Sequence, residues 1–128
     1  MGSIKYYKAP DIEDEIQKII KGIEMEHLDI GRIACVRSIG SKSRHIIARC
    51  HSVSRIIQAS LGLGPHYIIE VISEQFDKLP QEEKTKTLIH ELMHIPKNFG
   101  GGFRHHDFVN RKTVDGIYKK YLSIRNGC

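Results

Sequence analysis

Apolar side chains recur at helical spacing in three stretches of the chain. In the first stretch, isoleucines follow Asp11, which we expect to cap a helix over residues 11–21. The second helix should begin at Pro80 and stop before Pro96, because a proline disfavours helical geometry in the residue that precedes it. The third should follow Asp107, its expected N-cap. The apolar positions of the three predicted helices are Ile12, Ile16, Ile19, Ile20 and Ile23; Leu88, Ile89, Leu92, Met93 and Ile95; and Val109, Val114, Ile117, Tyr118, Tyr121 and Leu122.

Between the first two helices the pattern changes to alternation and to short β-branched runs. Residues 32–39 alternate apolar and basic side chains, residues 40–43 are typical of a turn, and residues 45–53 are again β-like, which predicts a hairpin. Residues 67–73 predict a further strand, whereas residues 54–61 fit either a short helix or an extended link. We therefore predict an α+β fold, in which a small mixed three-stranded sheet packs on the N-terminal, Pro80 and C-terminal helices.

The length and composition of the chain limit the classes of protein to which it can belong. Its 128 residues fit one domain, over residues 1–128, with a single hydrophobic core. The apolar runs are far shorter than the roughly 18 residues of a membrane span, and the N-terminus lacks the apolar stretch of a signal peptide. Cys35, Cys50 and Cys128 form an odd set without CxxC spacing, so we expect a reducing, cytoplasmic setting.

The net charge of +5 is spread unevenly along the chain. Residues 30–69 contain six Lys and Arg and no acid, and residues 104–128 contain six bases against two acids. The first of these, the basic block, could form a positive face that attracts nucleic acid or an acidic substrate. Alternatively, its cations only protect exposed strand edges against pairing.

The predicted Pro80 helix contains an HExxH motif, His90-Glu91-Leu92-Met93-His94. At i and i+4 the two imidazoles project from one helical face, where both can reach one zinc ion at roughly 2.0–2.1 Å. Glu91 can then turn toward the metal and act as general base on water. The motif therefore predicts a catalytic Zn²⁺ site.

A catalytic zinc site needs a third protein ligand and an open position. His105 and His106 follow the motif after a glycine-rich loop, and the spacing does not decide between them. Two other interpretations remain open: His90 and His94 form an exposed pair without metal, or three histidines hold a structural zinc. A structural site usually recruits cysteines and would leave Glu91 without a task.

The motif and its surroundings resemble a known family. The chain is similar to the phage-type metallopeptidases, small archaeal and viral relatives of SprT-like zincins, over about residues 32–122. The similarity runs through HSVSRIIQASLG and YIIEVISEQFDKLPQEEKTKTLIHELMHIPKNFGGG to the HH pair, and its most specific part is LIHELMHIPK. It implies a minimal zincin fold and a zinc peptidase, with His90 and His94 as ligands, Glu91 as base and His105 or His106 as third ligand. Unlike broader SprT-like proteins, this chain has no His-Gly pair for the third ligand and no cysteine zinc ribbon.

The leading functional hypothesis is zinc-dependent hydrolysis of peptide bonds in a peptide or protein substrate. The alternatives are a nucleic-acid-associated zinc protein that uses the basic block, including a protease linked to DNA, and a non-catalytic zincin scaffold. For the oxyanion that peptide hydrolysis generates, the candidate donors are Arg104, Tyr118, Tyr121 and the spare histidine. Cys50 and His51 should point to opposite faces of a strand, which argues against a shared metal.

Overall fold

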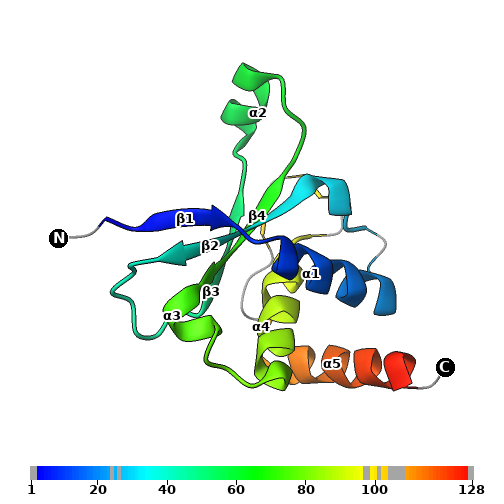
Figure 1. Ribbon diagram of the computed structural model, residues 1–128. Coiled ribbons are helices and arrows are strands. Elements are labelled where there is room, and N and C mark those ends of the chain that lie inside the picture. Colours follow the sequence, from blue (N-terminus) through cyan, green and yellow to red (C-terminus); the bar gives the residue numbers. More distant parts are fainter. Residues whose placement is uncertain are drawn as a thin grey trace.

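A four-stranded mixed sheet forms the centre of the molecule, and helices α1, α4 and α5 lie together on one side of it (Figure 1). The computed structural model describes residues 3–23, 25, 27–96, 99–100, 102–103 and 109–126, apart from the side chains of residues 125 and 126. The strands of this part are β1 (Lys5–Lys8), β2 (Ile33–Ile39), β3 (Ala48–Ser52) and β4 (Tyr67–Ile72). The α-helices are α1 (Pro10–Gly22), α2 (Arg55–Leu61), α3 (Ser73–Phe76), α4 (Gln81–Met93) and α5 (Arg111–Asn126), and a 3₁₀ turn, Ile30–Arg32, precedes β2. The predicted α+β class is confirmed.

The order of the strands differs from the predicted hairpin. The sheet runs β1-β2-β4-β3, so β4 lies between the two strands that we expected to pair. β4 is parallel to β2 and antiparallel to β3, while β1 is antiparallel to β2. The hairpin prediction is wrong because β4 is apolar at almost every position, and such a strand is most stable where neighbours cover both of its edges. β3 is therefore an edge strand.

The fourth strand, β1, was missed in the sequence. All four of its residues are exposed, so Lys5–Lys8 has no apolar alternation from which a strand could be predicted. Its pairing with β2 is set by the backbone, with Tyr6 opposite Ser38 and Lys8 opposite Val36.

The hydrophobic core fills the space between the sheet and the helices. Ile69 and Tyr67 of β4 are fully buried, and Cys35 of β2 and Cys50 of β3 flank Ile69 in the same row. On the helix side of the core, α1 buries the predicted stripe Ile12, Ile16, Ile19 and Ile20, and α4 buries Leu88, Ile89, Leu92 and Met93. The predicted core faces of these two helices are thus confirmed.

The caps of two helices differ from the predicted ones. α1 begins at Pro10 with Ala9 as its N-cap, and Asp11 makes an ion pair with Arg37 of β2 instead of capping. α5 begins at Arg111, where the Asn110 side chain accepts a hydrogen bond from the Thr113 N–H (3.1 Å) and the Thr113 hydroxyl accepts one from the Asn110 N–H (3.1 Å). This reciprocal arrangement satisfies the first turn of α5. The other predicted cap, Asp107, lies outside the described residues.

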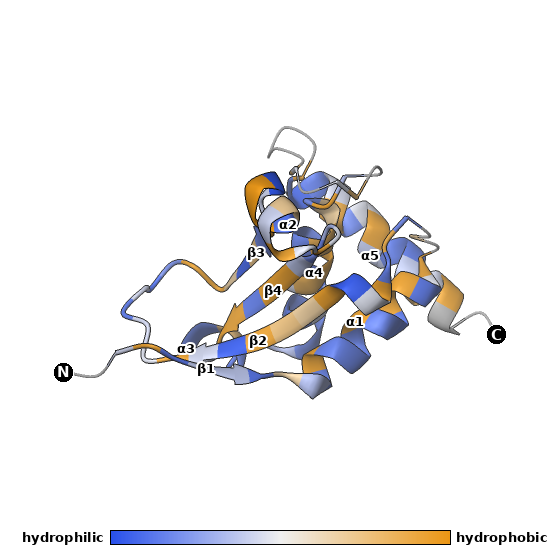
Figure 2. Ribbon diagram, turned by 90° about the horizontal axis from the view of Figure 1, so that it is seen from above, coloured by the Kyte–Doolittle hydropathy of each residue, from blue (hydrophilic) through white to orange (hydrophobic). Residues whose placement is uncertain are grey.

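Residues 54–61 form a helix rather than an extended link. Ser54 caps α2 by accepting from the Ile57 N–H, and Gly62 ends the helix with a φ of 67°. α2 stands apart from the other helices, beyond the ends of β3 and β4 (Figure 1). It exposes apolar side chains, with Ile56 77% and Leu61 68% accessible. Figure 2 shows hydrophobic residues along the ribbon of α2.

Candidate active site

The two histidines of the HExxH motif lie at the C-terminal end of α4, which ends at Met93, before the predicted stop at Pro96. His90 is in the last turn, and His94 is the residue that ends the helix. Pro96 causes the early end, since it has no N–H to donate and restricts Ile95. His94 nevertheless keeps helical angles (φ −69°, ψ −17°), so both imidazoles still leave one face of α4.

The spacing of the two imidazoles fits a shared metal ion. Nε2 of His90 and Nε2 of His94 are 3.2 Å apart. Two nitrogens at this separation, each about 2.0–2.1 Å from a metal ion, subtend about 100°, close to the tetrahedral angle that zinc prefers. The donor set of two neutral imidazoles is also the one that zinc favours. Zn²⁺ could therefore be held by His90 and His94 without any rearrangement of α4.

The third ligand is expected from the segment between α4 and α5. His105 and His106, our two candidates, lie outside the described residues. Within the described residues, no three His, Cys, Asp or Glu side chains come together as a metal-binding cluster. His90 and His94 are thus the two candidate ligands that the described residues contain, and α5 begins only five residues beyond His106.

Glu91 lies in a dry environment beside the two histidines. The residue is only 7% exposed, and burial raises the pKa of its carboxyl to about 7. On the sheet side its neighbour is Cys50 of β3, whose pKa is raised to about 12 by burial and, to a smaller extent, by the charge of Glu91. α4 therefore presents Glu91 toward the edge strand of the sheet, next to the candidate metal ligands.

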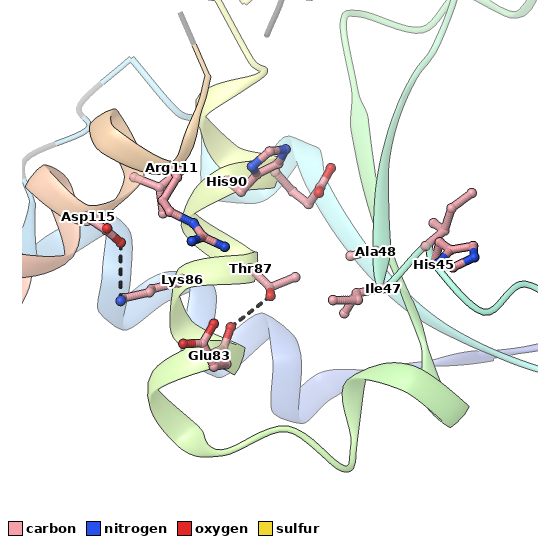
Figure 3. Close-up of a pocket in the computed structure, with 12 residues that line it drawn as sticks. His45, Ile47, Ala48, Glu83, Lys86, Thr87, His90, Arg111 and Asp115 are labelled. Atoms are coloured by element: carbon pink, nitrogen blue, oxygen red, sulfur yellow. Dashed lines mark hydrogen bonds and ion pairs between the residues drawn. The ribbon is translucent and has the colours of Figure 1, made fainter.

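His90 and Glu91 open into a cleft of about 680 Å³ (Figure 3). One wall is the face of α4, a second is the beginning of α5, and the third is the segment that leads into β3. The lining residues are His45, Ile46, Ile47, Ala48, Glu83, Lys86, Thr87, His90, Glu91, Arg111, Val114 and Asp115. This volume is in the range of small-molecule and peptide pockets.

The cleft contains charged groups that sequence reasoning missed. Lys86 of α4 is 3.2 Å from Asp115 of α5 and 3.8 Å from Glu82. Arg111 extends from the start of α5 toward the face of α4 that carries His90 and Thr87 (Figure 3). Only the proximity of the final helix to His105 and His106 in the sequence could have pointed to Arg111.

The loop that follows α4 is attached to the core by Tyr67. Its ring is fully buried in β4, and its hydroxyl donates a hydrogen bond to the carbonyl of Gly102 (2.8 Å). Phe99 and Phe103 pack edge-on against the same ring, with centroids 5.0 and 6.0 Å away. Gly102 is three residues before His105, so this attachment restrains the chain just before the candidate third ligands.

Two of the candidate oxyanion donors, Tyr118 and Tyr121, lie in the described part of the chain and do not line the cleft. The Tyr121 ring packs against Gly22 at the end of α1, only 2.9 Å from where a Cβ would lie. The Tyr118 ring faces the ammonium of Lys86 at 5.2 Å. Arg104 lies outside the described residues, as do both histidines of the HH pair.

Cys50 and His51 point to opposite faces of β3, as predicted from their adjacency. Cys50 packs against the core, whereas Nε2 of His51 lies 2.8 Å from the carboxylate of Glu70 on the other face. Arg49 also approaches Glu70, at 3.5 Å. This part of β3 therefore carries an ion-pair cluster on its outer face and no shared metal site.

The basic block of residues 30–69 does not form a single row of free cations. Arg37 makes ion pairs with Asp11 and Asp77 on the helix side of the sheet, whereas Arg49 pairs with Glu70 on the opposite face. Arg32 pairs with Asp29 at 3.4 Å. Three of the six cations are thus partly neutralised by acids that lie outside the block in the sequence.

A comparison with known protein families gives a match over residues 4–121, to the family described as "Putative phage metallopeptidase". The chain belongs to this family. The match starts well before residue 32, so it also includes β1 and α1. No curated protein and no solved structure matches the chain.

Membership in the phage metallopeptidase family implies a hydrolase that depends on a metal ion and acts on protein substrates. The fit of His90 and His94 to a tetrahedral metal ion agrees with that implication. In the described part of this metallopeptidase, no helix is long and apolar enough to span a membrane.

Proposed function

We propose that the protein is a zinc-dependent peptidase of minimal zincin-like fold. The observation that carries the proposal is the pair of imidazole nitrogens 3.2 Å apart, beside a buried carboxylate, at the wall of an open cleft. Zn²⁺ would be held by His90, His94 and either His105 or His106. The zincin-like element is α4 packed against β3, which places the motif next to the edge of the sheet.

In the proposed reaction, Glu91 moves the protons. When bound, zinc supplies Lewis-acid activation of water and of the scissile carbonyl. Glu91 accepts a proton from the attacking water and delivers it to the nitrogen of the leaving amine. Its position supports this role, because the carboxyl is adjacent in the chain to the candidate ligand His90 and lines the same cleft.

β3 supports binding of an extended substrate. It is the last strand of the sheet, so its outer edge is free of any strand among the described residues. An extended peptide can add to such an edge through backbone hydrogen bonds. Ala48, the first residue of β3, also lines the cleft, so a peptide added to β3 would pass in front of Glu91 and His90.

Metal stoichiometry of purified variants tests the ligand set. We expect one zinc per chain in the wild type and loss of zinc in His90→Ala and His94→Ala, because removal of one imidazole from a three-ligand site weakens binding severely. Of His105→Ala and His106→Ala, one should lose zinc and the other should retain it.

His45→Ala is the matched control, because His45 lines the same cleft away from α4. It should retain one zinc per chain. Zinc bound equally well by the wild type and by His90→Ala would show that the HExxH motif is not the metal site.

A further inference from the structure

Arg111 is placed to meet a substrate within the cleft. Asp115, one turn further along α5, contacts Lys86 of α4 at 3.2 Å. Arg111 is one turn back along α5 from Asp115, and His90 is one turn forward along α4 from Lys86. Both residues line the cleft, and Figure 3 shows the Arg111 side chain extending toward the face of α4 that carries His90.

The charges of the cleft leave Arg111 available for an anion. Lys86 is already paired with Asp115 and Glu82, whereas no acidic side chain in the described ranges lies within ion-pair distance of Arg111. Two acids of the lining remain: Glu91 belongs to the motif itself, and Glu83 is seven residues before His90, which is about 10 Å along the helix axis. Among the described residues of the lining, Arg111 is therefore a cation without an acidic partner, whereas Lys86 has two.

We propose that Arg111 forms a subsite for a substrate carboxylate next to the scissile bond. The inference rests on the proposed peptidase function and specifies its substrate class. A guanidinium binds a carboxylate through two parallel N–H donors, so this subsite favours an anionic group over its neutral isostere. The carboxylate comes either from an Asp or Glu side chain or from the C-terminus of the peptide.

Cleavage of matched peptides tests the subsite. In an octapeptide library, one central position would be Asp, Asn, Glu, Gln, Leu or Lys, and each peptide would carry either a free or an amidated C-terminus. We expect kcat/KM to be about tenfold higher for Asp than for Asn, equivalent to about 1.4 kcal/mol. Arg111→Ala should remove the preference, and Arg111→Glu should favour Lys.

The arms of the experiment distinguish the two sources of the carboxylate. If the preference for Asp and Glu survives amidation of the C-terminus, the bound carboxylate is that of the side chain. If amidation lowers kcat/KM and Asp and Asn peptides are cleaved equally well, the bound carboxylate is the C-terminus. Lys112→Ala is the matched control, because Lys112 is the exposed neighbour of Arg111 on α5 and does not line the cleft. It should keep the wild-type preference.

Binding to the Glu91→Gln protein separates this inference from the proposed function. By fluorescence anisotropy with labelled Asp and Asn octapeptides, we expect about tenfold tighter binding of the Asp peptide. Arg111→Ala in the same background should abolish the difference. If Glu91→Gln binds the Asp peptide more tightly than the Asn peptide but the wild type hydrolyses neither, the proposed peptidase function is refuted and the carboxylate subsite is supported. An unchanged Asp-to-Asn ratio in Arg111→Ala, in cleavage or in binding, overturns the inference.

Discussion

At the scale of single residues, the site depends on polar groups that the fold has removed from water. Glu91 is 7% exposed, and Cys35 is 2% exposed in the row of the sheet that ends at Cys50. Residue types and spacing predicted the place of Glu91 in the candidate site, because helix geometry alone fixes the relative positions of His90, Glu91 and His94. Arg111 could not be predicted, since its role depends on the pairing of α4 with α5.

Cys35 and Cys50 should be chemically inert in the folded protein. Burial is the main cause that raises the pKa of each thiol to about 12, so almost no thiolate exists near neutral pH. In a Cys128→Ser background, reaction with Ellman's reagent at about pH 8 should be at least about a hundredfold slower in the native protein than in guanidinium. Rapid labelling of either native thiol would contradict its burial beside Ile69.

At the scale of elements, the helix that carries the HExxH motif is well predicted and the sheet is not. Pro80 and Pro96 limit α4 on both sides, and local apolar periodicity is sufficient to position its buried face. The order of the strands depends on contacts between distant segments, and alternation within one segment contains no information about its neighbour. The central position of β4 was therefore outside the reach of sequence reasoning, although its apolar composition was visible.

Tyr67→Phe should loosen the loop that precedes the candidate third ligands. The substitution removes the hydroxyl that donates to Gly102 and leaves that carbonyl without its donor. We expect a loss of about 1 kcal/mol in the free energy of unfolding, measured by urea denaturation, and weaker zinc binding in a competition titration. The control is Tyr6→Phe, because Tyr6 is 62% exposed in β1. Equal zinc affinity and equal urea midpoints for the wild type and Tyr67→Phe would refute a restraining role.

The link between β3 and β4 through Glu70 should make stability depend on pH. Burial raises the pKa of Glu70, but the hydrogen bond from His51 and the charge of Arg49 outweigh burial, so the net pKa lies below its usual 4.5. Since the unfolded chain then binds the proton more readily, this contribution is present above about pH 4.5 and is lost as the pH falls through the lower folded value.

Chemical denaturation at several pH values checks this dependence. Glu70→Gln should cost about 1 kcal/mol near pH 7 and should reduce the loss of stability on acidification. Glu15→Gln, in an exposed pair with Lys18, is the control and should follow the wild type. A wild-type slope retained in Glu70→Gln would assign the acid sensitivity to other groups.

At the scale of the whole molecule, the fold redistributes the charge that the sequence groups together. Arg37 and Arg49 belong to one acid-free segment, yet they lie on opposite faces of the sheet and pair with acids from other segments. The composition gives the net charge of +5, but the strand order is needed to predict the face of the sheet on which each cation lies. Arg111, which lies outside the basic block, lines the cleft and has no acidic partner among the described residues.

The whole arrangement brings three features to one place: the HExxH end of α4, the outer edge of β3, unpaired among the described strands, and a cleft lined in part by α5. A peptide that adds to β3 would be presented to His90, Glu91 and the side chain of Arg111. The central claim is that this place hydrolyses peptide bonds with zinc and with Glu91 as the base.

Hydrolysis of the octapeptide library by the wild type and by Glu91→Gln, at equal and verified zinc content, tests that claim most directly. Since Gln keeps the shape of Glu but cannot accept the proton, we expect cleavage by the wild type and a loss of at least about a hundredfold in kcat for the variant. Cleavage by zinc-loaded Glu91→Gln at the wild-type rate would contradict the account.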